Sequence, residues 1–199
     1  MTSNAQLIFD KLISQYPGGL KEITALSFNK TGNKNFVICS EKGFDYDLVT
    51  NCSNAYREHH KEKSPDALFC INDKLYFVEF KEGKHEKADI RLKIHEGITT
   101  LYMFTKRYLP DLKKEDFLKL DINYAVIARH NPNSTSSFQT ALLEASKKYQ
   151  LKNIEGFLVN QTRYTTQPSL ILKLIRTVTS GQITHIDIDD GIGGVQRFS

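Results

Sequence analysis

The sequence is poor in cysteine and has no pair of cysteines at a metal-binding spacing. Its cysteines are Cys39, Cys52 and Cys70, and none of them belongs to a C-x-x-C motif. An odd number of cysteines without an apparent secretory signal indicates reduced thiols, so we expect a cytoplasmic protein. The same pattern argues against a structural zinc site, which needs closely spaced thiol or imidazole ligands.

Long apolar runs and several common signature motifs are also absent. The N-terminal segment is polar and then amphipathic, and no run approaches the ~20 apolar residues that span a bilayer. We therefore expect no membrane partner. The sequence contains no internal repeat, no Walker-type phosphate-binding loop and no nucleophile elbow, which disfavours repeat proteins, P-loop nucleotide hydrolases and α/β-hydrolases.

The sequence does have the composition of one well-cored globular domain. Its 199 residues are 40% hydrophobic and 25% charged. We assign residues 1–190 to a single domain and the glycine-rich residues 191–199 to a flexible tail. The net charge of +4 permits nucleic-acid binding but does not require it.

Hydrophobic periodicity predicts alternating strands and helices. Apolar residues at three- and four-residue spacing indicate helices, and short β-branched or alternating runs between turn residues indicate strands. The expected helices are 4–16, 86–109, 136–149 and 168–180. The expected strands are two or three within 23–28, 36–41 and 44–49, followed by 66–71, 74–81, 122–128, 154–160 and one that begins near 183. This order predicts an α/β fold with a mixed central β-sheet flanked by α-helices.

Residues 64–84 carry most of the functional information. Two strand-like runs, DALFCI and KLYFVEFK, flank a two-residue turn at 72–73, which predicts a tight β-hairpin. Counting back along both strands places Asp66 directly opposite Glu79, with ~4.5–5.5 Å between their Cβ atoms. Because side chains alternate along a strand, Glu79 and Lys81 point to the same face.

Two carboxylates this close repel each other, so we expect a positive charge between them. Mg²⁺ would suit this place because it prefers oxygen ligands together with waters and substrate phosphate oxygens. Lys81 would then neutralise developing charge or help deprotonate water. The alternative is that Asp66 is a turn residue after Pro65, and that Glu79 and Lys81 form an ion pair on an exposed strand. Apolar residues on both faces of the second strand favour a buried central strand instead.

Pro65-Asp66, followed after the hairpin by Glu79-Phe80-Lys81, resembles the PD-(D/E)xK superfamily of metal-dependent nucleases. The resemblance implies a restriction-endonuclease-like fold, with Asp66 and Glu79 as ligands of Mg²⁺ or Mn²⁺ and Lys81 as the catalytic lysine. It implies an endonuclease that hydrolyses phosphodiester bonds in nucleic acid, DNA rather than RNA, and a homodimer would suit the two strands of a duplex. The alternative is a catalytically inactive nucleic-acid-binding or structural module on the same fold.

Members of that superfamily often take a further acid from upstream of the motif. The candidates here are Glu22, Asp45, Asp47 and Glu58. Glu58 is the nearest of them to the motif along the chain, but the sequence does not choose among the four.

The expected helix 86–109 carries a basic stripe that begins close to the motif. The stripe consists of Lys84, Lys87, Arg91 and His95. Residues at three- or four-residue steps stack on one helix face, so a substrate lying across the site would meet these side chains with its phosphates. The alternative is an ordinary solvated helix face. Gly97 in the same helix is expected to mark a close contact between helix and sheet.

Overall fold

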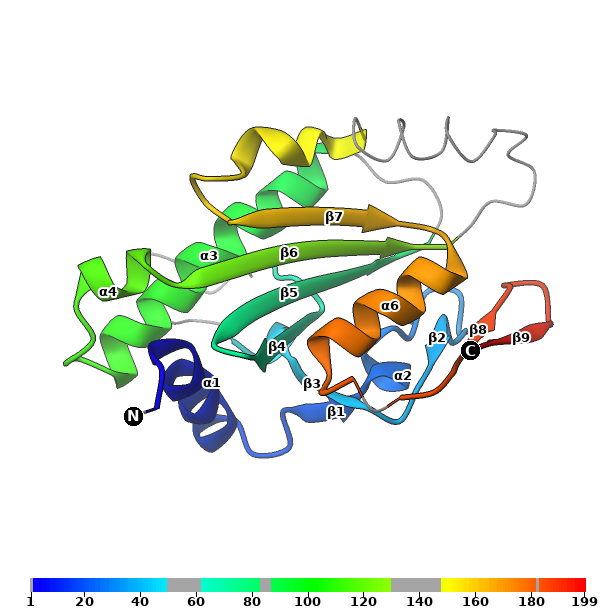
Figure 1. Cartoon of the computed structure of the whole chain (residues 1–199), viewed down its shortest axis with the longest axis horizontal. Helices are drawn as coiled ribbons and strands as arrows, with labels where there is room; N and C mark the ends of the chain where they lie inside the picture. Colours follow the sequence, from blue (N-terminus) through cyan, green and yellow to red (C-terminus); the bar gives the residue numbers. More distant parts are fainter. Residues whose placement is uncertain (1, 50–61, 83–86, 130–147, 182) are drawn as a thin grey trace.

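The computed structural model describes residues 2–49, 62–82, 87–129, 148–181 and 183–199. These residues form a six-stranded sheet with helices on both faces and a smaller three-stranded sheet beside it (Figure 1). The expected α/β class, with a mixed central sheet flanked by helices, is confirmed. Within the described ranges, no helix is both long enough and apolar enough to cross a membrane.

The central sheet places the motif hairpin in its middle. Its strands, in spatial order, are β1 (Leu20–Glu22), β3 (Lys42–Asp45), β4 (Ala67–Ile71), β5 (Lys74–Lys81), β6 (Asp121–Ala128) and β7 (Gln161–Thr165). The strands from β1 to β5 pair antiparallel, whereas β5, β6 and β7 pair parallel. β5 therefore has hydrogen-bonded neighbours on both sides, as expected for a buried central strand.

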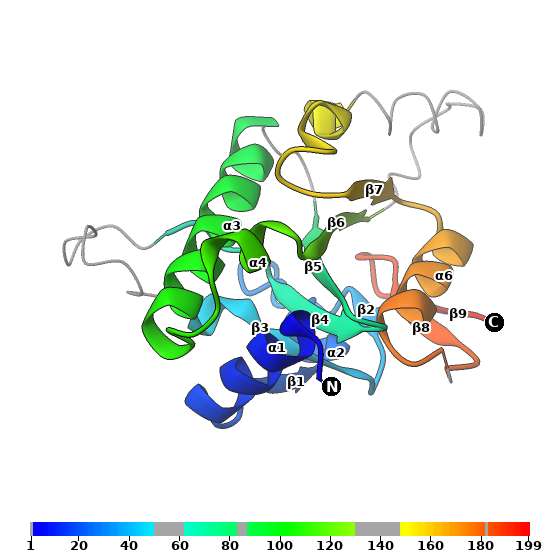
Figure 2. The same cartoon turned by 60° about the vertical axis from the view of Figure 1, so that its left-hand side comes forward.

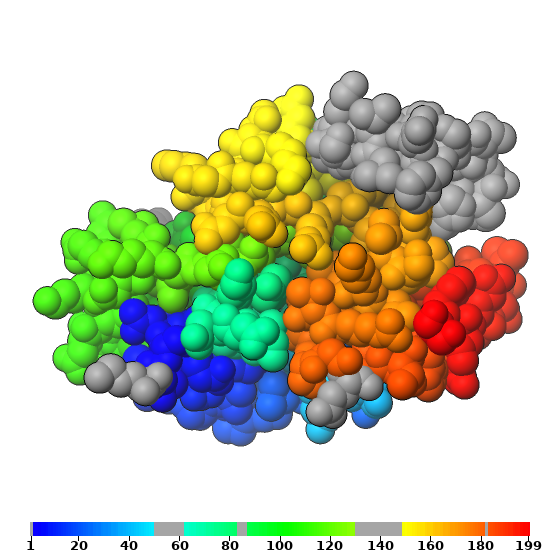
Figure 3. All heavy atoms as spheres, viewed as in Figure 1, coloured from blue at the N-terminus to red at the C-terminus, as the bar shows by residue number. Residues whose placement is uncertain are grey.

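The helices form two layers, one on each face of this sheet. They are α1 (Asn4–Gln15), α2 (Ile23–Leu26), η1 (Tyr46–Leu48), α3 (Lys87–Tyr108), α4 (Lys114–Leu118), η2 (Lys148–Ile154) and α6 (Pro168–Val178). Figure 2 shows α3 and α6 on opposite sides of the sheet. Along β5, Leu75 and Phe77 join the apolar cluster under α1 and α3, whereas Val78 joins the cluster under α6. By this alternation Glu79 belongs to the α3 side. The turn of the motif hairpin reaches the surface between α1 and α6 (Figure 3).

The second sheet contains the end of the chain and differs from the expected flexible tail. It has the order β2 (Val37–Ile38), β8 (Ile186–Asp189) and β9 (Val195–Phe198), all antiparallel. The glycine-rich residues before β9 form a turn because Asp190 Oδ1 accepts hydrogen bonds from the N–H groups of Ile192 and Gly194, at 2.8 and 2.9 Å. This turn returns the chain onto β8 instead of releasing it as a tail.

The strand expected at 23–28 is wrong, because Ile23–Leu26 forms the short helix α2. The Ile23 N–H donates to the carbonyl oxygen of Glu41 at 2.8 Å, and the Thr24 hydroxyl donates to the carbonyl oxygen of Cys39 at 3.1 Å. These contacts with the segment before β3 override the β-propensity of a short β-branched run.

Other strand boundaries also differ from expectation. The run 154–160 contains a turn at Gly156, which has φ +75°, and the strand begins only at Gln161. The run 44–49 leaves the sheet after Asp45 and continues as η1, and the run 36–41 contributes only the two residues of β2. The helix expected at 136–149 lies mostly outside the described residues.

Gly97 marks a close contact of α3, but with the segment just before β4 and not, as the sequence predicts, with a strand of the sheet. A Cβ atom added there would lie 2.7 Å from Cδ of Pro65, the residue directly before Asp66 and two before the start of β4. The hydroxyl of Tyr46 also donates to the carbonyl oxygen of Gly97, at 2.9 Å. α3 is therefore held directly against the residue that positions the first motif acid.

We predict that Gly97→Ala lowers the free energy of unfolding by ~1–3 kcal/mol, because the overpacking at Pro65 outweighs the gain in helix propensity. Thr99→Ala, on the exposed side of the same helix, is the control and should change stability by less than ~0.5 kcal/mol. Urea denaturation of the three proteins makes the measurement. A Gly97→Ala variant as stable as the wild type would contradict the tight contact.

Candidate active site

The hairpin has the register that brings the two motif acids together. Asn72 and Asp73 both have positive φ, at 49° and 61°, as a two-residue type I′ turn requires. The paired residues run from Ile71 with Lys74 to Ala67 with Val78. One further step along each strand sets Asp66 beside Glu79. The two-residue turn therefore determines the register that places the two carboxylates opposite each other.

The Glu79 carboxylate is buried and lies between two ammonium groups. Its side chain has no solvent exposure, and its Oε1 lies 2.6 Å from Nζ of Lys81 and 2.6 Å from Nζ of Lys93. Its other oxygen, Oε2, is buried and has no hydrogen-bond partner in the described part of the chain. The expected same-face pair of Glu79 and Lys81 is present, but on a buried strand rather than an exposed one.

Asp66 stands at the edge of this cluster, where it is partly open to solvent. Its Oδ2 accepts a hydrogen bond of 2.6 Å from the N–H of Phe80, and its Oδ1 lies 3.4 Å from Nζ of Lys93. The carbonyl oxygen of Asp66 accepts from the N–H of Tyr46 at 3.3 Å. The residue is thus fixed by backbone on both sides, and its remaining carboxylate surface faces the cavity.

Lys93 is the site residue that the motif did not reveal. It comes from α3, and its ammonium occupies the place between the carboxylates where a positive charge is expected. The sequence does contain a signal for Lys93, because this lysine stands among Ile90, Ile94 and Gly97 at the spacing of the inward helix face. A lysine at such a position is rarely buried without an acidic partner.

Burial and mutual repulsion shift the pKa values of the two acids. Burial, assisted by the nearby Asp66, raises the pKa of Glu79 to about 7 despite the two lysines. Burial likewise raises the pKa of Asp66, and Lys93 and the Phe80 N–H only partly oppose it. Burial alone would lower the pKa of Lys93, but the attraction of Glu79 and Asp66 outweighs it and raises that pKa. Lys93 therefore stays protonated between acids that resist ionisation together.

A third acid, Asp89, contacts the lysines from the first turn of α3. Its Oδ2 lies 3.6 Å from Nζ of Lys81, and its Oδ1 lies 2.6 Å from Nζ of Lys63. The net effect of these two lysines and Lys93 is to lower the pKa of Asp89, although burial opposes it. Lys81 is thus held between Glu79 and Asp89 and retains 12% exposure of its side chain.

The structure describes three of the four candidate upstream acids. Asp45 and Asp47 both line the same pocket as Asp66. Asp45 is paired with Lys21 at 2.6 Å, and Asp47 accepts a hydrogen bond from the Ser64 hydroxyl. Glu22 lies in the edge strand β1, and Glu58 lies outside the described residues. Among the described candidates, Asp47 is the one whose charge adds to the burial that raises the pKa of Asp66, so it is the upstream acid that the structure brings to the motif.

The donor set has the chemistry of a hard divalent-cation site but not its full ligand number. Asp66 and Glu79 supply carboxylate oxygens, one of which is buried and unpartnered. Within the described ranges, no group of three or more Asp, Glu, His or Cys residues is arranged to hold a metal ion. A cation there would have two protein carboxylates and would complete its shell with water or substrate oxygens.

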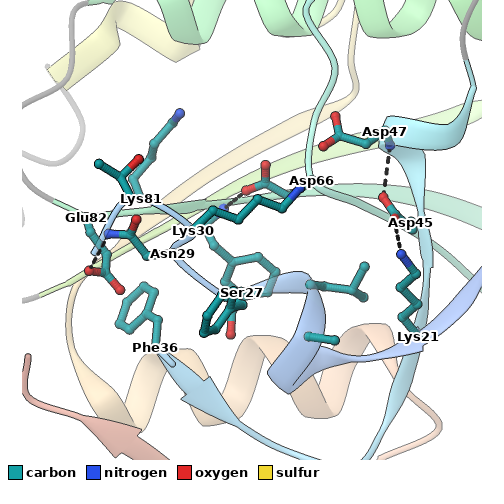
Figure 4. Close-up of a pocket in the computed structure, with 15 residues that line it drawn as sticks. Lys21, Ser27, Asn29, Lys30, Phe36, Asp45, Asp47, Asp66, Lys81 and Glu82 are labelled. Carbon is teal, nitrogen blue, oxygen red and sulfur yellow. Dashed lines mark hydrogen bonds and ion pairs between the residues drawn. The ribbon is translucent and has the colours of Figure 1, made fainter. Parts of the chain in front are cut away.

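A pocket of about 550 Å³ opens next to these residues (Figure 4). Asp47, Asp66 and Lys81 line it, together with residues 27–31 of the loop that follows α2. Figure 4 shows the ion pair of Lys21 with Asp45 at one end. The site therefore combines buried acid and lysine side chains with a cavity large enough for a small ligand.

The basic stripe on α3 lies elsewhere. Lys87 donates to the side-chain oxygen of Gln150, and Arg91 Nη1 donates to the carbonyl oxygen of Gln150 at 3.1 Å. His95 is exposed on the same helix, and Lys84 lies outside the described residues. None of the described members of the stripe lines the pocket, so their contact with nucleic acid remains a prediction.

The raised pKa of Glu79 predicts pH-dependent stability in the metal-free protein. A glutamate in the unfolded chain titrates at ~4.3, whereas Glu79 in the folded chain titrates at about 7. Between these values the folded state binds more protons, so the free energy of unfolding decreases as the pH rises. Glu79→Gln removes this contribution, on the order of 3 kcal/mol, and should flatten the profile.

Chemical denaturation from pH ~5 to ~8 measures this effect. Glu115→Gln, at an exposed position in α4, is the matched control and should keep the wild-type slope. An unchanged slope in Glu79→Gln would show that Glu79 titrates normally in the folded protein.

Comparison of the chain with protein-family models, with curated proteins and with solved structures found no match in any of the three.

Proposed function

We propose that this protein is a cytoplasmic, Mg²⁺- or Mn²⁺-dependent nuclease that hydrolyses phosphodiester bonds in nucleic acid, DNA in preference to RNA. We also propose that its mixed sheet has the restriction-endonuclease-like arrangement. The observation that carries the proposal is the buried Glu79 carboxylate, placed beside Asp66 and held by Lys81 and Lys93 next to an open pocket.

A purely structural role is disfavoured by the free energy needed to bury these charged residues. Burying a charged pair costs several kcal/mol of desolvation, and an apolar replacement is often as stable or more stable. Clusters of acids with strongly shifted pKa values next to a cavity are typical of catalytic sites. The resemblance of Asp66, Glu79 and Lys81 to the nuclease motif indicates which chemistry this cluster serves.

Asp66 and Glu79 are the residues that would hold the metal ion. Bound there, Mg²⁺ or Mn²⁺ would supply a Lewis acid for the phosphoryl group. Both carboxylates are already oriented, Asp66 by the Phe80 N–H and Glu79 by two lysines. The Lys93 ammonium lies between these carboxylates, so it would have to give way where the metal ion binds.

The two lysines have different proposed roles. Lys81 lines the pocket, so its ammonium is placed to contact a substrate phosphate and to stabilise charge that develops during in-line displacement. Lys93 does not line the pocket and contacts both carboxylates, which makes it a positioning residue.

A second candidate function is a nucleic-acid-binding module without catalysis. Lys93 favours it, because its ammonium already balances the two carboxylates without a metal ion. The two candidates differ in one property, the binding of a divalent cation at Asp66 and Glu79.

Substitution of the motif residues tests the nuclease. Asp66→Asn and Glu79→Gln should lose both Mn²⁺ binding and cleavage, because each removes a negatively charged ligand. Lys81→Met should bind Mn²⁺ like the wild type but cleave ~10²-fold more slowly or worse, since it removes only charge stabilisation. Calorimetric titration with Mn²⁺ and cleavage assays on plasmid, single-stranded DNA and RNA supply the measurements.

Lys119→Met is the control for these variants, because the Lys119 side chain is 77% exposed and distant in sequence from the motif. It should match the wild type in both assays. If Asp66→Asn and Glu79→Gln bound Mn²⁺ with unchanged stoichiometry and affinity, the metal assignment would fail.

Lys93→Met separates the nuclease from the binding module. Without metal it should lose ~3–5 kcal/mol of stability, because two facing carboxylates remain without their shared cation. Lys21→Met, which breaks the more exposed pair with Asp45, should lose less than ~1 kcal/mol. In the nuclease, Mn²⁺ takes over the balancing charge and should raise the Tm of Lys93→Met more than that of the wild type. Thermal scans in which Mn²⁺ raises neither Tm would favour the binding module.

A further inference from the structure

Part of the pocket lining is not used by the proposed chemistry. This part is the 27–34 loop, which lies between α2 and β2 and carries Phe28. The Phe28 side chain lines the pocket, is 38% exposed and has no aromatic partner in the described part of the chain. By contrast, Phe36 and Phe80 pack edge to face with 6.5 Å between ring centroids. Phe28 is thus the most exposed of the three phenylalanines that line this pocket, and the one available to contact a ligand.

A cation accompanies this ring. Lys30 lines the pocket two residues after Phe28 and has no ion-pair partner among the residues that the structure describes. Lys21, the other lysine on this side, is already paired with Asp45. In Figure 4 the Lys30 side chain extends into the pocket towards Asp66. A ligand there would meet an aromatic ring and the Lys30 ammonium together, next to the carboxylates of Asp47 and Asp66 that also line the pocket.

The 27–34 loop is held in place before any ligand binds. Asn29 and Lys34 exchange two backbone hydrogen bonds, of 2.9 and 3.2 Å, which close the loop as a small hairpin. The Asn29 side chain donates to Oε2 of Glu82 at 3.0 Å, and Glu82 directly follows Lys81 in the sequence. Arg129 Nη2 donates to the other oxygen of Glu82 at 2.7 Å. The loop that bears Phe28 and Lys30 is therefore fastened to the strand that bears the motif.

We infer that this pocket binds one unstacked nucleotide, with its base against Phe28 and a flanking phosphate near Lys30, so that the substrate is single-stranded nucleic acid. This inference rests on the proposed nuclease function and names its substrate class. Proteins that bind single strands combine aromatic rings, on which bases stack, with basic side chains that contact the phosphates, and they do so without reading the sequence. In a continuous duplex each base is stacked between its neighbours and cannot enter a side pocket without being flipped out. The pocket volume of about 550 Å³ is in the range of small-ligand sites.

Binding of short fluorescent oligonucleotides tests this inference, with Ca²⁺ in place of Mg²⁺ and anisotropy as the readout. The probes are an oligothymidylate, a strand of equal length made only of abasic residues, and a blunt duplex. Phe28→Ala should weaken binding of the oligothymidylate by roughly 5- to 150-fold, as expected for the loss of one base–aromatic stack. It should leave the abasic strand and the duplex unaffected, and Phe28→Trp should restore binding.

Lys30→Ala should weaken binding of the oligothymidylate and of the abasic strand alike, and it should reduce the salt dependence of both. Phe157→Ala is the matched control, because this ring is 85% exposed and does not line the pocket. Unaltered oligothymidylate binding in Phe28→Ala, or an equal loss on the abasic strand, would overturn the stacking site. Stacking without cleavage in Mg²⁺ would uphold the site and reject the nuclease. Cleavage of single strands at the wild-type rate by Phe28→Ala would uphold the nuclease and reject the site.

Discussion

The Glu79 carboxylate, buried in the central sheet, sets the requirement that the surrounding packing has to meet. It lies on the central strand β5, fully removed from solvent, and an acid in that position needs cations that come from elsewhere in the fold. Lys81 supplies one from the same strand and Lys93 supplies the other from α3. Lys93 reaches Glu79 only if α3 lies close to the sheet. The charge balance of the site and the packing of α3 therefore depend on the same contact.

Gly97 meets that requirement one turn further along α3. The absence of a side chain lets the helix contact Pro65, and the same approach allows the Tyr46 hydroxyl to reach the Gly97 carbonyl. A glycine inside a helix costs up to ~1 kcal/mol of helix propensity. Here the lower helix propensity is offset by a contact that orients Pro65, the residue before Asp66. The glycine therefore favours the position of the first acid at the expense of helix stability.

Arg129 joins the site to the second sheet. It follows β6, and its Nη2 donates to Glu82 and to the carbonyl oxygen of Asn35, at 2.7 and 2.9 Å. Its guanidinium also lies over the Phe36 ring, 4.7 Å from the centroid, and Nη1 lies 3.7 Å from Asp189 in β8. A planar cation with several donors can hold such separate acceptors in fixed positions, which a lysine could not do as well. The pocket wall, the end of β5 and the small sheet are thereby tied together.

The local parts of this arrangement were predictable from the sequence alone. Alternation along two short runs and a two-residue turn determined the hairpin register, and with it the proximity of Asp66 to Glu79, because strand pairing follows from turn length. Helical spacing likewise predicted α1, α3 and α6 with nearly their observed ends. These features depend on neighbours within a few residues, which a linear pattern records.

What fills the space between the acids depends on how α3 packs against the sheet, which the sequence pattern does not reveal. Lys93 lies fourteen residues beyond Glu79, and it becomes their partner only when α3 is laid across the sheet. Long-range contacts also turned Ile23–Leu26 into a helix, recruited Val195–Phe198 into a strand and engaged Lys87 and Arg91 with Gln150. The pocket is lined by residues of the 27–34 loop and of β5, and other strands of the central sheet contribute to it as well. Each of these depends on segments distant in sequence meeting in space, and local propensity and periodicity contain no information about such meetings.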